Sequence, residues 1–160
     1  MTSFLNRFIF SHDFVGQQSW NLLKWCGTHG ASEFTLAMLS LQDSPAPFLD
    51  GAEKLLEPFV LPAAPREFVI GEPLVRPATL WSLSQESIAA LKHLFPDGLF
   101  MYPTSEWEQG CIEDPTFYRQ GRFFLGIVSH EHEGKLTVSE AELVELERAG
   151  YRMSEHSEWL

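Results

Sequence analysis

Residues 114–150, DPTFYRQGRFFLGIVSHEHEGKLTVSEAELVELERAG, decide the fold of this chain, because they read as one continuous unit. Two strand-like runs, 116–119 and 122–129, flank Gln120 and Gly121, where glycine can supply the positive φ angle that a hairpin turn requires. The second run contains FFLGIV, which is nearly all apolar and is typical of a central strand covered on both faces. The stretch therefore opens with a predicted β-hairpin.

The second half of the stretch continues this unit with a turn, a strand and a helix. Glu133 and Gly134 predict the turn, and residues 135–138 predict the returning strand. Ser139 and Glu142 stand three positions apart, as the two members of a helix capping box do. We therefore expect a helix to follow at once and to end near the next glycine.

The rest of the chain predicts further layers around this unit. Residues 34–41 fit both helical and strand periodicity, and we favour a strand because glycine precedes them and proline follows. A strand–helix–strand pattern over residues 79–102 predicts a parallel crossover. Further helices are expected over 13–26 and 51–57, and further strands over 8–10 and 67–70. The class is α+β, with a mixed, largely antiparallel sheet of five or six strands and three or four helices packed mostly on one face.

The length of the chain, 160 residues, predicts a single globular domain over residues 1–160. A domain of this size buries enough surface to fold without disulfides or metals. Residues 151–160 are polar and acidic apart from one tryptophan, and we expect them to form an acidic tail that can fray.

Charge and cysteine content restrict the compartment and the partners. The formal net charge is −11, and the acid excess is concentrated after residue 103, where 12 acidic residues face 5 basic ones. Such a chain repels nucleic acid and anionic lipid and attracts a basic partner. Two cysteines far apart, Cys26 and Cys111, form no disulfide framework, and the first ten residues lack an export signal pattern. No uncharged stretch approaches the roughly 20 residues that span a bilayer. A cytoplasmic protein is expected.

The histidine pair His130 and His132 is a candidate metal site. On an extended strand the two imidazoles would face the same side, about 6.6 Å apart, and could bind a transition metal such as zinc. The third ligand would come from elsewhere, and His12, Glu113 and His156 are candidates. The alternative is a solvated hairpin end, where polar residues are expected in any case.

The acidic loop at residues 104–114 is a candidate contact surface. An aromatic side chain among carboxylates suits recognition of a basic protein. The residues that would form this surface are Glu106, Trp107, Glu108, Glu113 and Asp114. Close to this loop in the sequence, Arg119 and Arg122 form a small basic island, which could hold an anion but which we expect to offset neighbouring acids across the hairpin.

No sequence motif specifies a reaction. The chain has no nucleophile elbow and no glycine-rich phosphate loop. The leading hypothesis is therefore a non-catalytic interaction or accessory module, inhibitor-like, that binds a basic partner. The first alternative is a metal-binding protein or metal-dependent enzyme that uses His130 and His132. The second alternative, a pocket for an apolar small molecule, rests on the 13 Phe, 5 Trp and 3 Tyr residues.

Overall fold

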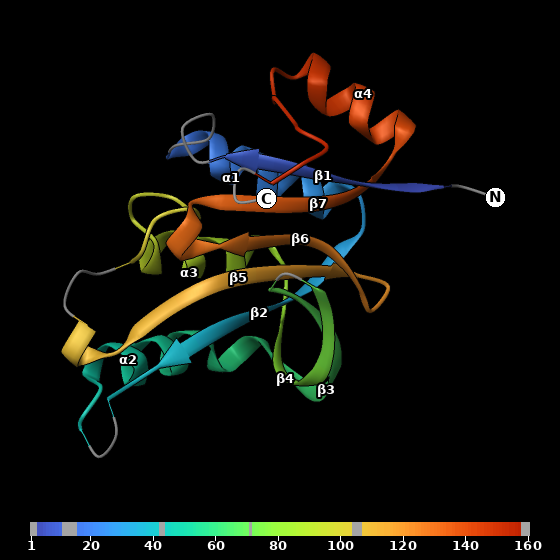
Figure 1. The fold of residues 1–160 in the computed structure, drawn as a ribbon. Helices are drawn as coiled ribbons and strands as arrows, with labels where there is room; N and C mark the ends of the chain where they lie inside the picture. The colour runs from blue at the N-terminus through green and yellow to red at the C-terminus, as the bar shows by residue number, and fades with distance from the viewer. Residues whose placement is uncertain (1–2, 11–15, 42–43, 71, 104–106, 158–160) are drawn as a thin grey trace.

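A computed structural model describes residues 3–10, 16–41, 44–70, 72–103 and 107–157, which fold around one seven-stranded sheet (Figure 1). The strands are β1 (Phe4–Phe10), β2 (Ala31–Leu39), β3 (Val60–Ile70), β4 (Glu72–Ser82), β5 (Cys111–Arg119), β6 (Arg122–Val128) and β7 (Glu133–Ser139). Their order across the sheet is β1-β7-β6-β5-β2-β4-β3, and every neighbouring pair is antiparallel. The α+β class is confirmed, but the sheet has seven strands rather than five or six.

Four helices accompany the sheet in the described residues. They are α1 (Gln17–Thr28), α2 (Pro47–Leu56), α3 (Gln85–Leu94) and α4 (Glu140–Arg148). The predicted capping box is present at α4, where Ser139 Oγ accepts a hydrogen bond from the Glu142 N–H and Glu142 accepts one from the Ser139 N–H. None of these helices has the length and apolar character that crossing a bilayer requires.

The C-terminal unit follows its prediction closely. Gln120 and Gly121 form the β5–β6 turn with φ angles of 50° and 74°, and two positive φ angles match the twist of a two-residue hairpin. The next turn begins earlier than expected, because Ser129–Glu131 form a single 3-10 turn and His132 takes a left-handed φ of 52°. Glu133 therefore already belongs to β7.

The predicted parallel crossover over residues 79–102 is wrong. Residues 99–101 form a turn and a bend, and Tyr102 is irregular, so no strand is present here. The Leu99 N–H donates to Ser19 Oγ on α1 at 3.1 Å, and Leu99 and Phe100 are almost completely buried. Burial against a helix, rather than strand pairing, therefore explains why this segment is apolar.

The strands of the β3–β4 hairpin are longer than those predicted from the sequence, because they include segments that contain prolines. Residues 61–65 and 72–77 read as loops in the sequence because of their prolines, yet they belong to two 11-residue strands. Proline has no N–H to donate, so strands tolerate it where that side of the backbone lacks a partner. Pro65 faces Pro77 in the register, which places two missing donors at one position of the ladder.

Apolar side chains from strands and helices form one core. Phe34 on β2 and Phe117 on β5 are fully buried, and their ring centroids are 5.9 Å apart. They belong to the same cluster as Leu23 of α1 and Leu91 of α3. Alternate residues on β5 face the other way, and Tyr118 meets Phe68 of β3 edge-on at 6.4 Å. The β3–β4 hairpin therefore covers part of the face that these two helices leave open.

Two ion pairs extend from the predicted basic island, but their acids lie on other elements of the fold rather than across the hairpin. Arg119 pairs with Glu142 at 2.7 Å, and Arg122 pairs with Glu67 at 2.9 Å. The first joins β5 to α4, while the second joins β6 to the β3–β4 hairpin. The island therefore connects elements of the fold.

Candidate functional site

The candidate site is built on a bulge in β5. A register shift against β2 leaves Asp114 and Pro115 opposite the single residue Leu36. Asp114 has a φ of 53°, in the left-handed region that favours glycine, and the following proline further disfavours it. Such strain costs about 1 to 3 kcal/mol and persists only where surrounding contacts hold it.

Two hydrogen bonds between Asp114 and Ser129 hold this strained residue. The Asp114 N–H donates to Ser129 Oγ at 2.9 Å, and the Ser129 N–H donates to Asp114 Oδ1 at 2.8 Å. Ser129 is buried, so solvent competes weakly for these bonds. The bulge therefore fixes the Asp114 carboxylate in one orientation.

Glu113, Asp114 and His130 converge beside the bulge. One ligand atom from each lies within 4.8 Å of the others. The Tyr102 hydroxyl donates to Glu113 Oε2 at 3.2 Å, so this carboxylate is oriented as well. Mixed carboxylate and imidazole sets of this kind bind divalent transition metals.

The carboxylates of Glu113 and Asp114 create a negative potential that contributes to raising the pKa of nearby groups. Burial, followed by the charge of Glu113, raises the pKa of Tyr102 to about 12. Burial, followed by the charges of Glu113 and Asp114, raises the pKa of the Cys111 thiol to about 11. Both groups are therefore neutral at pH 7, and a cation at the cluster would lower the repulsion between the carboxylates.

Alkaline pH is expected to destabilise the protein through its thiols. Burial raises the pKa of Cys26 above its ordinary range as well. Unfolded thiols lose their proton near pH 8.5, so above that pH the folded state binds more protons and the free energy of unfolding falls as pH rises. Urea denaturation between pH 8 and 11 should show this decline, and a Cys26→Ala, Cys111→Ala variant should show a shallower one. Equal slopes would contradict the assignment.

The structure brings together only some of the predicted site residues. His132 does not belong to the cluster, because the 3-10 turn and its left-handed φ replace the extended geometry that would align it with His130. Glu106 and His12 lie outside the described residues, and so does the side chain of Trp107. Glu108 is exposed on a separate 3-10 turn.

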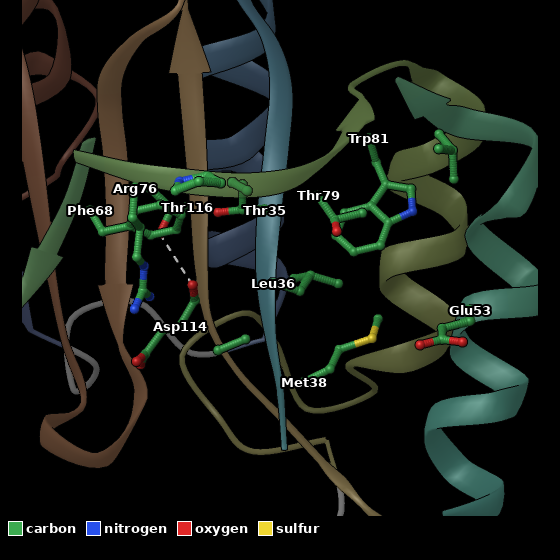
Figure 2. A pocket seen from close by; sticks show the side chains of 14 residues that line it. Thr35, Leu36, Met38, Glu53, Phe68, Arg76, Thr79, Trp81, Asp114 and Thr116 are labelled. Carbon is green, nitrogen blue, oxygen red and sulfur yellow. Dashed lines mark hydrogen bonds between the residues drawn. The ribbon is translucent and has the colours of Figure 1, made fainter. Parts of the chain in front are cut away.

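A cavity of about 600 Å³ lies beside the cluster and includes Asp114 in its lining (Figure 2). Its walls mix charged, hydroxyl and aromatic side chains, including those of Glu53, Arg76, Thr116 and Trp81. The lining residues come from five elements, β2, α2, β3, β4 and β5, so sequence reasoning missed the cavity. The prolines of β4 were the available signal, because they mark a strand with an open side.

Comparisons with known proteins give no relative. No family model, curated protein or solved structure matches this chain. Functional inference therefore depends on the geometry of the site.

Proposed function

We propose that this protein binds a divalent transition metal ion, such as zinc, through Glu113, Asp114 and His130. The observation that carries the proposal is the convergence of their three ligand atoms within 4.8 Å. Carboxylate oxygen and imidazole nitrogen are ordinary ligands of zinc and of neighbouring first-row metals. This site keeps one histidine of the pair considered from sequence and replaces the other by two carboxylates.

Hydrogen bonds behind the ligands support the proposal. Ser129 holds one oxygen of Asp114, which leaves Oδ2 for the metal, and Tyr102 holds Oε2 of Glu113. Partners of this kind orient ligands, and their loss typically weakens metal affinity about 10- to 100-fold. Three protein ligands leave a fourth position for water or substrate, which is the pattern of catalytic rather than structural zinc sites. The neighbouring cavity would give a substrate access to that position.

Metal content is expected to depend on His130 and not on His132. Untagged wild-type protein should bind about one equivalent of zinc in equilibrium dialysis, and His130→Ala or Glu113→Gln should weaken binding at least about tenfold. His132→Ala is the matched control, since it removes an imidazole two residues away that lies outside the cluster. Wild-type binding of less than about a tenth of an equivalent, or an equal loss in the control, would refute the site.

A second candidate function is the binding of a basic partner. The net charge of −11 favours it, and so does the presence of two carboxylates, Asp114 and Glu53, against one guanidinium, Arg76, in the cavity lining. The protein would then act as an accessory or inhibitor-like module. Its charge disfavours nucleic acid as that partner.

The cytoplasm is the compartment that we propose. Cys26 and Cys111 are both unpaired and buried, and thiols of this kind are usual where the environment is reducing. Cell fractionation of the native protein would test the assignment, since recovery with a secreted or membrane fraction would contradict it.

A further inference from the structure

Strands β2 and β4 separate soon after they meet. Two residue pairs join them, Glu33 with Ser82 and Phe34 with Trp81, whereas nine pairs join β3 to β4. Beyond this point residues 35–39 of β2 continue along β5, while β4 turns away with β3 (Figure 1). The sheet is therefore split, and the cavity lies in the split.

The split exposes the outer backbone edge of β2. The Leu83 N–H donates to the Ser32 carbonyl at 2.9 Å, so Ser32 and the paired Phe34 direct their backbone groups toward β4. Strand alternation then directs the N–H and C=O groups of Leu36 and Met38 to the same side. In the described part of the chain no residue hydrogen-bonds to these outer groups.

The opposite wall of the split is a poor partner for an added strand. The same alternation on β4 directs the backbone of Trp81, Thr79 and Pro77 toward the gap. Pro77 has no N–H, so this edge lacks a donor where a strand would need one. An incoming strand would therefore pair with β2.

Side chains around the edge favour a basic occupant, because two carboxylates and one guanidinium, that of Arg76, line the cavity. Asp114 and Glu53 lie on opposite sides of Leu36 and Met38 in the view of Figure 2. In an extended peptide successive side chains point to opposite faces, so each carboxylate would meet one row of them.

We propose that the outer edge of β2, residues 35–39, binds an extended basic segment of a partner protein as an added strand. This inference rests on the second candidate function, the binding of a basic partner, and shares only Asp114 with the proposed metal site. Main-chain hydrogen bonds to Leu36 and Met38 supply affinity, and the carboxylates on either side select basic side chains. The added strand would fill the cavity and hydrogen-bond to the outward N–H and C=O groups of β2.

The experiment uses the full chain in EDTA, which excludes metal, and a fluorescein-labelled octapeptide in which pairs of lysines alternate with pairs of valines, so that both faces of the extended peptide carry lysine. Two further peptides carry N-methyl groups on one alternate set of residues or on the other. The parent peptide should bind with a dissociation constant of about 100 μM or tighter. One methylated peptide should lose at least about tenfold in affinity while the other retains it, because only one edge of the peptide faces β2.

Protein variants test the same bonds from the other side. Leu36→Pro removes one outward N–H without removing a bond to β5, and it should weaken binding at least about tenfold. Leu36→Thr changes the side chain but keeps the N–H, and it should bind within about threefold of wild type. Circular dichroism and urea denaturation confirm that both variants are folded.

Four results would overturn the inference. Equal binding of both methylated peptides, or wild-type affinity in Leu36→Pro, would show that the peptide binds by charge elsewhere, and the basic-partner function would survive. No saturable binding of the parent peptide below about 1 mM would remove both the edge site and that function. A wild-type dimer that Leu36→Pro dissociates would assign the edge to a second copy of the chain.

Discussion

Replacing Arg119 with methionine is expected to lower the free energy of unfolding by about 3 to 5 kcal/mol, because it leaves the Glu142 carboxylate partly buried without its partner. The two guanidinium nitrogens Nη1 and Nη2 donate to the two carboxylate oxygens at 2.7 and 3.0 Å. Nη2 also donates to the Thr137 carbonyl at 3.2 Å, and the guanidinium lies 3.8 Å from the Phe124 ring centroid. One side chain therefore joins β5, β6, β7 and α4.

The pH dependence of this pair has a defined sign. Burial alone would raise the pKa of Glu142, but hydrogen bonds from Arg119 and from the Ser139 backbone lower it below its usual value. A carboxyl group with a lowered pKa stabilises the folded state above its unfolded pKa, about 4.3, and loses that contribution as pH falls through the folded pKa. The difference in stability between wild type and Glu142→Gln should therefore shrink below about pH 4.3.

Urea denaturation at pH 7 measures the effect, and Arg122→Met provides the control. Arg122 also belongs to an ion pair, but its side chain is 76% exposed, so its loss should cost less than about 1 kcal/mol. Similar losses in the two variants would show that burial of the Arg119 pair is unimportant. Partial recovery in an Arg119→Met, Glu142→Leu variant would support the unpaired charge as the cause.

Replacing Phe34 with alanine is expected to destabilise the protein by about 3 to 5 kcal/mol, because it opens a cavity in the centre of the core. Phe34 is fully buried, and its ring centroid lies 5.7 Å from that of Trp81 and 5.9 Å from that of Phe117. It also belongs to the second of the two residue pairs that join β2 to β4. Its loss should therefore loosen the junction as well as the core.

Two measurements separate these effects. Thermal and urea denaturation report the global loss, with Phe4→Ala as the control, since Phe4 is 55% exposed and should cost less than about 1 kcal/mol. Amide hydrogen exchange at Leu83, whose N–H bonds to the Ser32 carbonyl, reports the junction. A loss no larger than that of Phe4→Ala would show that the cavity collapses without cost.

Local signals made the C-terminal part of the fold predictable. The β5–β6 turn depends on Gly121 and the capping box on Ser139 and Glu142, and each acts within a few residues of chain. The β3–β4 hairpin was missed because its prolines read as loop residues, although β3 is an edge strand and β4 is open on one side for most of its length. That openness arises from the arrangement of the sheet, which local sequence does not encode.

The candidate site was predictable only in part, because the positions of some of its residues depend on the arrangement of the sheet. Glu113 was among the expected third ligands for a histidine site, and His130 was one of the two histidines. Asp114 was expected at a contact surface and not beside His130, because its position depends on a bulge created by the register between β2 and β5. His132 was expected beside His130 on an extended strand, but it follows a 3-10 turn and itself has a left-handed φ angle.

Because of the split between β2 and β4, the β3–β4 hairpin has only a narrow backbone connection to the rest of the sheet. The β3–β4 hairpin is attached to the remaining five strands through two adjacent residue pairs, and side-chain contacts such as Arg122 with Glu67 fasten it further out. Substitutions at side-chain contacts such as Arg122 with Glu67 can therefore change the distance between β2 and β4 without altering any residue that lines the cavity. The capacity of the cavity could thus evolve, or be engineered, from a distance.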